Sequence, residues 1–392
     1  MKRFEIGKHV PQKGGFSAFI PNSFPPATEI KLPIKLLSAH TEAVHLLGKL
    51  DGVFGLLPDK DWFLTMFVLK DAFSSCQIEG TNATIPDVIE RQNIESRSGP
   101  LSDVDDILHY IDALEHGLKR GGESPFSLRF LRELHERLME GEKTSQFPFM
   151  EEFRATQFSY FGEFRTTQNW IGGTGLDDAR FIPPPVYEMH RALGDLKKFL
   201  QTDDEFPVLV KAGLLHAQFE TIHPFIGGNG RMGRMLMSMF LCQEKLLESP
   251  VLYLSSYFKK HQKLYFERLN GYPNGKVSEW LAFFMDGIIA TARSAIKTCN
   301  GVRELRDRDM QKISELGKTA TQSTMNILEN LYKMPVIGIA DIVKWTGFSH
   351  KGGYNAINRL VEMKILKPMK TGGSAYAQKW IYSDYIALFS ED

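Results

Sequence analysis

The stretch TIHPFIGGNGRMGRML, residues 221–236, carries the pattern that decides how this chain folds and what it does. Pro224 fixes its own φ angle and restricts His223, so the preceding helix is expected to end near Thr221. Three glycines then let the backbone approach a ligand closely, and these are Gly227, Gly228 and Gly230. No Lys-Ser/Thr pair follows them, so the loop is not a Walker A loop.

The next helix is expected to start around Gly230 and to point its unpaired backbone N–H groups at the loop, which makes an anion site. Arg231 and Arg234 lie three residues apart on its first turn, so both guanidinium groups can reach the same anion. His223 stands at the rim, with a side chain suited to accepting a proton near neutral pH. The pattern predicts a histidine base beside a polyphosphate-binding loop. A glycine-rich turn with solvated arginines is the alternative.

The composition is that of an ordinary globular protein. The 392 residues are 43% hydrophobic and 24% charged, and 47 basic residues balance 47 acidic ones, so no overall charge attracts nucleic acid or a membrane surface. The three cysteines form no CxxC pair, which indicates reduced thiols in a cytosol. No window reaches the roughly 18 apolar residues of a membrane span. We therefore expect a soluble, cytoplasmic protein that does not bind a membrane.

Apolar residues recur three and four apart through most of the chain, which predicts a mainly α-helical fold. Residues 1–60 are expected to form an N-terminal arm, extended at first, and a first helix. Residues 61–300 are expected to form one helical domain, and the charged segment 301–318 a linker helix. Glycines, prolines and the echo of EEFRATQ (151–157) in GEFRTTQ (162–168) interrupt the helical domain, and a strand pair or flap fits there.

Residues 319–392 predict a separate winged helix-turn-helix domain. Three short helical patterns precede a hairpin predicted over 367–389 with its turn at Thr371–Gly373, and Gly347 stands where the turn between two of the helices needs it. The third helix carries six side chains that can reach DNA bases or phosphates, which are His350, Lys351, Tyr354, Asn355, Asn358 and Arg359. Residues 321–392 hold eight basic and six acidic residues, a small excess for a DNA-binding protein. Binding of duplex DNA and contact with a protein both stay open.

The segment HPFIGGNGRMGR (223–234) resembles the signature of Fic-domain proteins, His-x-Phe-x-(Asp/Glu)-Gly-Asn-Gly-Arg-x-x-Arg. The segments GEFRTTQNWIGG…ARFIPPP, LYLSSYFKKHQKLYFERL and WLAFFMDGI are also similar to family segments, so the resemblance covers roughly residues 40–295. It implies a Fic-type helical bundle with a β-hairpin flap. Most members transfer AMP from ATP to a hydroxyl side chain of a target protein, and the family often forms dimers. The resemblance thus implies a protein adenylyltransferase and leaves a homodimer open.

The resemblance also implies a role for each signature residue. His223 would be the general base that deprotonates the target hydroxyl, and Phe225 would be a buried anchor. The residues implied to bind the nucleotide are Gly228, Asn229, Gly230, Arg231, Arg234 and Tyr265. Among these, Arg234 would hold the γ-phosphate, and Tyr265 falls where the family places an aromatic ring near adenine. The flap implied to dock the target backbone by strand addition consists of Gln168, Asn169, Trp170, Ile171 and Gly172.

Gly227 departs from the signature. The family places Asp or Glu there, and that carboxylate holds the Mg²⁺ that bridges the α- and β-phosphates. A glycine offers no side-chain ligand, so Mg²⁺ or Mn²⁺ would be held mainly by ATP. We expect slower transfer, a changed metal preference or another nucleotide chemistry. The alternative function is a DNA-binding regulator whose Fic-like domain senses nucleotide. His216, two helical turns before His223, is expected to be a core histidine bonded to a neighbour.

The segment FSSCQIEGTNAT, residues 73–84, suggests a built-in inhibitor. Glu79 would lie in the last turn of a helix over 61–80, where the helix dipole disfavours a carboxylate and invites a cationic partner. A solvated surface glutamate is the alternative. The residues Ser75 to Gly80 resemble the inhibitory motif (Ser/Thr)-x-x-x-Glu-(Gly/Asn) of Fic proteins with an N-terminal inhibitory helix. The resemblance implies that Glu79 pairs with Arg234 and obstructs the γ-phosphate; in some relatives this glutamate supports removal of AMP.

Overall fold

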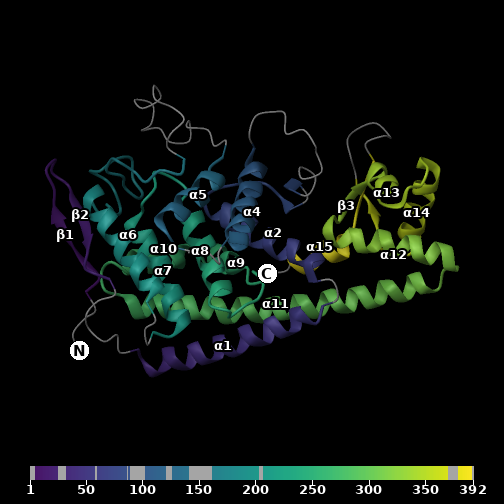
Figure 1. Cartoon of the computed structure of the whole chain (residues 1–392), viewed down its shortest axis with the longest axis horizontal. Helices are drawn as coiled ribbons and strands as arrows, with labels where there is room; N and C mark the ends of the chain where they lie inside the picture. The colour runs from purple at the N-terminus through teal and green to yellow at the C-terminus, as the bar shows by residue number, and fades with distance from the viewer. Residues whose placement is uncertain are drawn as a thin grey trace.

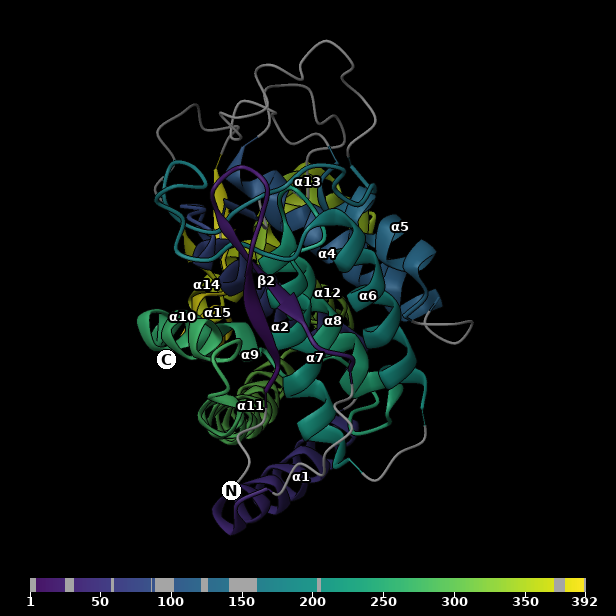
Figure 2. The same ribbon diagram turned by 90° about the vertical axis from the view of Figure 1, so that its left-hand side faces the viewer.

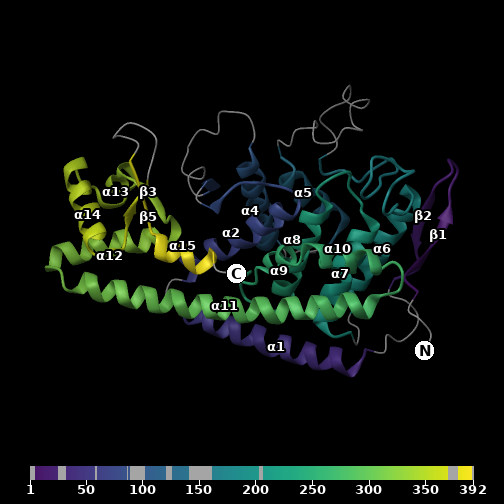
Figure 3. The same ribbon diagram turned by 180° about the vertical axis from the view of Figure 1, so that it is seen from behind.

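The computed structural model describes residues 5–24, 32–57, 60–85, 87–88, 102–120, 126–140, 161–202, 206–369 and 378–390. These residues are mainly helical, as predicted. The longest helix, α11 (Val277–Ser314), runs along the length of the molecule between α1 (Ile34–Gly55), which packs along its lower side, and the other helices (Figures 1 and 3). None of the described helices is both long and apolar enough to cross a membrane.

The prediction of a separate linker helix over 301–318 is wrong. Residues 301–314 continue α11 without a break, and α12 begins at Lys318. The reason is that the buried stripe of α11 does not stop at residue 300, since Val302, Leu305 and Ile313 are buried on it. The domain boundary drawn from the charge of this segment therefore falls inside one helix.

Nine helices of the described residues form the body together with α11, and two of them, α7 (Val208–Ile222) and α8 (Asn229–Gln243), lie at its centre. Almost every residue of α7 is buried, so this helix lies in the core rather than on its surface. The other helices of the body are α1, α2 (Lys60–Ile78), α4 (Asp103–Arg120), α5 (Leu128–Leu138), α6 (Val186–Gln201), α9 (Leu254–Lys260) and α10 (Gln262–Gly271). The loop between α7 and α8 is thus held from both ends by buried helices.

Two short β elements flank the body. Strands β1 (Gly7–Pro11) and β2 (Ser17–Pro21) form an antiparallel hairpin at the end of the molecule opposite the C-terminal helices (Figures 1 and 2). In the flap region the described residues contain one isolated bridge, between Ile171 and Phe181, rather than a β-hairpin. The echoed segment 151–157 lies outside the described residues.

The C-terminal residues begin with α12 (Lys318–Lys333), β3 (Val336–Gly338), α13 (Ile339–Thr346) and α14 (His350–Glu362), followed by β4 (Lys367–Pro368), β5 (Lys379–Ile381) and α15 (Ser383–Ser390). The strands form an antiparallel sheet in the order β3-β5-β4. Gly347 has a φ of 69° directly after α13, where a left-handed residue ends a helix. The predicted turn at 371–373 lies outside the described residues.

The predicted hairpin ends earlier than expected, because residues 383–390 are helical. Tyr385, Ile386 and Phe389 bury one face of α15 at helical spacing. This helix and α12 pack on α2, with ring centroids 5.1 Å apart for Phe67 and Phe389 and 4.8 Å apart for Phe63 and Tyr332. The C-terminal elements therefore contact the helix that precedes Glu79.

Candidate active site

The loop between α7 and α8 reverses direction through two residues with left-handed backbone. His223 follows the last turn of α7 with a φ of 49°, and Gly228 precedes α8 with a φ of 71°. A left-handed conformation is uncommon for a histidine and occurs mainly where surrounding contacts enforce it. Asn229 supplies such contacts. Its side chain accepts from the N–H of Phe225 at 2.9 Å and donates to the carbonyl of Phe225 at 2.8 Å.

The carbonyl groups of the loop are hydrogen-bonded from the buried side. Arg165 donates from Nε to the His223 carbonyl at 3.0 Å and from its backbone N–H to Pro224 at 2.9 Å. Asn169 donates to the carbonyls of His223 and Phe225 at 3.3 and 3.1 Å. Asn169 is thus buried against the loop, and its side-chain amide is used to hold the loop. These hydrogen bonds hold the loop in place directly before the first turn of α8, where a helix has N–H groups without intrahelical partners.

His135 completes this support and was not identified from the sequence. Its ring stacks on Phe225 with centroids 3.7 Å apart, Nδ1 accepts from the N–H of Gly162 at 3.1 Å, and Nε2 lies 3.0 Å from the carbonyl oxygen of Gly227. Burial lowers the pKa of His135 to about 3, so the ring is neutral and its Nε2–H donates to Gly227. As predicted, Phe225 is fully buried.

A cavity of about 300 Å³ lies in front of the loop. Most of the predicted site residues meet there, which are Glu79, Trp170, Ile171, Gly172, His223, Gly230, Arg234 and Tyr265. The cavity is also lined by residues of α10 that the sequence did not single out, Phe266, Leu269 and Asn270. Arg231 is directed away from it, toward Met139 and Asp106, with Nη1 3.9 Å from the Asp106 carboxylate.

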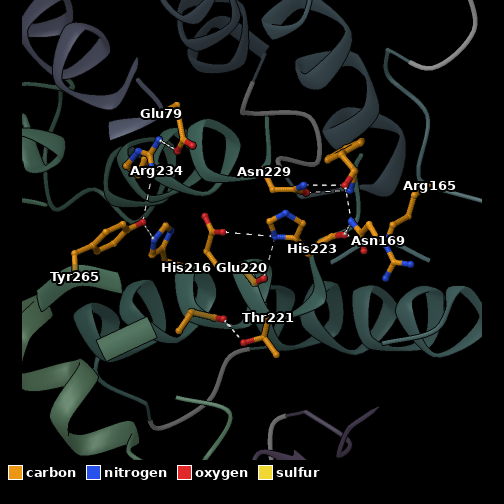
Figure 4. Close-up of polar contacts among 12 residues, drawn as sticks. Glu79, Arg165, Asn169, His216, Glu220, Thr221, His223, Asn229, Arg234 and Tyr265 are labelled. Carbon is orange, nitrogen blue, oxygen red and sulfur yellow. Dashed lines mark hydrogen bonds and ion pairs between the residues drawn. The ribbon is translucent and has the colours of Figure 1, made fainter. Parts of the chain in front are cut away.

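Arg234 is fully buried and paired with Glu79 (Figure 4). Its Nη2 donates to Glu79 Oε1 at 2.6 Å and to the Ser75 carbonyl at 3.0 Å, while Nε donates to Ser75 Oγ at 2.9 Å. Burial acts to raise the pKa of the Glu79 carboxyl, but the charge of Arg234 holds this pKa below its ordinary value. The ion pair expected from the sequence is therefore present in this structure.

The Glu79 carboxylate also lies over the first turn of α8. A Cβ atom built on Gly230 would come within 2.3 Å of Glu79 Oε1, so a larger residue there would displace this oxygen. The N-terminal turn of a helix attracts anions, because its N–H groups lack partners and the helix dipole is positive there. Glu79 thus occupies an anion position between Arg234 and the helix end.

His223 places a neutral imidazole at the edge of the cavity. Its side chain is 18% exposed, and Nδ1 lies 3.3 Å from the Glu220 carbonyl oxygen. Burial, together with the charge of Arg165, lowers the pKa of His223 to about 4, so the imidazole is uncharged at neutral pH. With its proton on Nδ1, the lone pair of Nε2 can accept another proton.

Tyr265 and His216 support Arg234 from behind. His216 Nε2 lies 2.8 Å from the Tyr265 hydroxyl, and Arg234 Nη1 donates to the same hydroxyl at 3.5 Å (Figure 4). His216 is fully buried, which confirms that it is a core histidine bonded to a neighbour. Only 1% of Tyr265 is exposed, and its ring stacks on Phe258 with centroids 4.6 Å apart, so one face of the ring is covered by the core.

The residues around Gly227 do not fit a metal ion held by the protein. Gly227 has no side chain, and its carbonyl oxygen already accepts from His135. Within the described ranges, no three His, Cys, Asp or Glu side chains gather as a metal site.

Comparison with known proteins identifies two family segments. Residues 125–241 match the Fic/DOC family and residues 37–119 match the Fic/DOC family N-terminal region. A 69-residue segment is 38% identical to a probable protein adenylyltransferase of Aquifex aeolicus, over 18% of this chain and 22% of that protein. A segment of 64 residues is 47% identical to a Fido domain-containing protein of Dictyostelium discoideum, and it covers 16% of this chain and 43% of that protein. The chain therefore spans less than half the length of these relatives.

Two crystal structures share the fold of the chain. A Fic family protein from Desulfovibrio desulfuricans is 17% identical with a TM-score of 0.56, over 92% of this chain and 98% of that one. A Fic domain containing signaling protein from Bacteroides thetaiotaomicron is 19% identical with a TM-score of 0.51, over 66% and 98%. At these identities the likeness establishes the fold alone.

Proposed function

We propose that this chain, which carries a Fic/DOC domain joined to a Fic/DOC N-terminal region, is a protein adenylyltransferase that its own Glu79 inhibits. One observation supports this most strongly. A neutral histidine, a helix N-terminus and a buried arginine line one cavity, and a carboxylate of the same chain occupies the anion position between them. Proton acceptance and polyphosphate binding are the two requirements of AMP transfer from ATP.

The proposed reaction starts with a Ser, Thr or Tyr hydroxyl of a target protein beside His223. Nε2 of His223 takes the hydroxyl proton while the hydroxyl oxygen bonds to the α-phosphorus of ATP, and the bond from that phosphorus to the pyrophosphate oxygen breaks. The N–H groups of the first turn of α8 and the guanidinium group of Arg234 would stabilise the phosphate charge. Trp170, Ile171 and Gly172 would position the target backbone at the cavity rim.

The proposed inhibition follows from the place of Glu79. The Glu79 carboxylate, 2.6 Å from Nη2 of Arg234, would take the place that a γ-phosphate needs beside this guanidinium group. Productive binding of ATP would therefore require Glu79 to leave, and an anionic phosphate would replace an anionic carboxylate between Arg234 and the helix end.

The experiment that tests this function compares two positions of the label in ATP. The Glu79→Gly variant is incubated with ATP labelled at the α-phosphate or at the γ-phosphate, and protein-bound label is measured after denaturation. AMP transfer would give protein-bound label from the α-position alone, with pyrophosphate released. Label from the γ-position would indicate phosphoryl transfer instead, and no label from either would favour a nucleotide-sensing role.

Replacing Gly227 by aspartate tests the role of the metal. We expect transfer by Glu79→Gly to depend weakly on which divalent ion accompanies ATP, because the protein offers no carboxylate at 227. Addition of Gly227→Asp is expected to raise the rate with Mg²⁺ over that with Mn²⁺ or Ca²⁺. Gly227→Ala, which adds a side chain without a ligand, is the matched control. Equal Mg²⁺ stimulation of both variants would contradict this reading.

A DNA-binding regulator is the second candidate, and the exposed face of α14 favours it. Lys351, Tyr354, Asn355 and Asn358 are exposed on one side of this helix, beside the three-stranded sheet, in the manner of the recognition helix of a winged helix domain. Arg359 does not belong to this face, because its Nη1 donates to Thr324 Oγ1 at 3.3 Å.

Titration of duplex DNA with the full chain at increasing salt decides this point. A regulator would bind duplex DNA with an affinity that falls with salt, and Lys351→Ala would weaken binding and lower the salt slope by about one. Lys344→Ala, on α13, is the control for the loss of one lysine. Absence of salt-dependent binding would leave contact with a protein as the function of this face.

A further inference from the structure

We propose that Glu220 is a positioning residue for His223, which fixes the ring proton on Nδ1 and stabilises the positive charge that the ring gains during transfer. This inference rests on the proposed function. Glu220 lies on the last turn of α7, three residues before His223. This spacing brings the two side chains to the same side of the helix end. The left-handed φ of His223 turns its ring back over that turn.

Two oxygen atoms of Glu220 lie near the same ring nitrogen. Its carbonyl oxygen is 3.3 Å from His223 Nδ1, and its carboxyl Oε2 is 3.8 Å from it. An acceptor on the Nδ1 side favours the tautomer with a proton on Nδ1, and the lone pair of Nε2 then stays available. A base in this tautomer can take the proton of a target hydroxyl without a rearrangement.

Packing alone does not explain why a carboxyl group is buried at position 220. The side chain of Glu220 is 13% exposed, and Oε1 is buried without a hydrogen-bond partner in the described part of the chain. A buried polar atom without a partner costs about 1–3 kcal/mol, so an apolar residue would suit the fold better here. Gly233 makes room for the carboxyl, since a Cβ there would lie 2.9 Å from Oε1.

Figure 4 shows Glu220 between His216 and His223, with Arg234 and Glu79 above His216 in the view. Burial raises the pKa of Glu220 to about 8, Arg234 acts to lower this pKa, and Glu79 acts to raise it. Arg165 and Glu79 are the charged groups that face His223 besides Glu220, and they act on its pKa in opposite directions. The carboxyl is therefore protonated in the resting state and ionises at mildly alkaline pH.

The proposed role follows from these positions. When Nε2 takes the target proton, the ring becomes an imidazolium with N–H groups on both nitrogens. An ionised Glu220 would accept from Nδ1 and offset that charge, as an opposite charge within about 4–6 Å shifts a pKa by 1–3 units. Transfer would thus be faster once Glu220 is ionised, and the proton taken by Nε2 would pass to water after the product leaves.

The first test measures transfer in the Glu79→Gly background from mildly acidic to mildly alkaline pH, because loss of Glu79 removes a charge that raises the pKa of Glu220 and so places this pKa below about 8. We expect kcat to rise with pH through this range. Addition of Glu220→Gln, of the same size and without an ionisable group, is expected to remove that rise and lower kcat roughly 10- to 100-fold above it, with the KM for ATP unchanged. Glu244→Gln, an exposed glutamate just past α8, is the matched control. An identical pH profile with and without Glu220→Gln would overturn the inference.

The second test does not depend on transfer. Carbethoxylation of His223 by diethyl pyrocarbonate is followed by peptide mass spectrometry in Glu79→Gly with and without Glu220→Gln. We expect the rate at His223 to rise through the same pH range only while Glu220 is present. If Glu79→Gly transfers no AMP, the proposed function fails, and this profile still decides the role of Glu220. Equal profiles in the two proteins would show that Glu220 does not act on His223.

Discussion

Glu79→Gly is expected to raise the rate of AMP transfer by about tenfold or more. In the structure Glu79 pairs with Nη2 of the buried Arg234 at 2.6 Å and covers the first turn of α8 at Gly230. A hydrogen bond to a charged group contributes about 1.5–3 kcal/mol, and each 1.4 kcal/mol is a factor of ten. Because the Glu79 side chain is 41% exposed, we expect the lower part of that range. Initial rates with α-labelled ATP measure the effect.

Thr81→Gly is the matched control, since it lies in the same segment after α2 and leaves the ion pair in place. Glu79→Gln keeps the size and removes the charge, so its rate separates obstruction from attraction. Arg234 loses its charged partner in both Glu79 variants, so the melting temperature should fall without ATP and recover with it. An unchanged transfer rate in Glu79→Gly would contradict the inhibitory role.

His223→Ala, added to Glu79→Gly, is expected to lower transfer by about 10²–10⁴-fold, the usual contribution of a general base. The imidazole is neutral at physiological pH because burial lowers its pKa to about 4. The helix end and Arg234 remain in place, so kcat should fall while the KM for ATP stays nearly constant. Rates with α-labelled ATP at several ATP concentrations separate the two constants.

His45→Ala, at an exposed position of α1, is the control for removal of a histidine. Transfer that persists at the full rate after His223→Ala would mean that another group takes the hydroxyl proton. In that case the tautomer and charge of His223 would have no bearing on the reaction.

The local parts of the site could be predicted from the sequence, because short-range rules decide them. Proline and glycine between two apolar periods predict a loop that ends one helix and starts the next, and α7 and α8 end and begin within a residue or so of the expected positions. The burial of His216 follows from its place on the helix, and the burial of Phe225 follows from the resemblance.

The contacts that hold the loop could not be predicted, because they join residues far apart in the chain. Arg165 and Asn169 bind the carbonyls of residues more than fifty positions later, and His135 binds Gly227 from still farther away. Asn169 looked like a docking residue since it lies in the flap segment. Arg231 looked like a phosphate ligand, yet the structure directs it toward Asp106 on α4.

Two predictions about the fold are wrong, one based on the charge of a segment and one on residues that favour strands. The charged segment after residue 300 looked like a linker, while its few apolar residues fall on the buried stripe of α11. Residues 383–389 fall within the predicted hairpin and include Tyr, Ile and Phe, which favour strands, but the spacing of the buried side chains is helical. In each case packing against a neighbouring helix decided the structure over local propensity.

The most direct test of the central claim is the intact mass of the Glu79→Gly chain after incubation with ATP, with and without His223→Ala. If the site transfers AMP, the mass of the chain or of an added target protein increases by one adenylyl group, and the increase disappears with His223→Ala. A chain that binds ATP but never gains this mass, with Gly227 as found or replaced by aspartate, would contradict the claim.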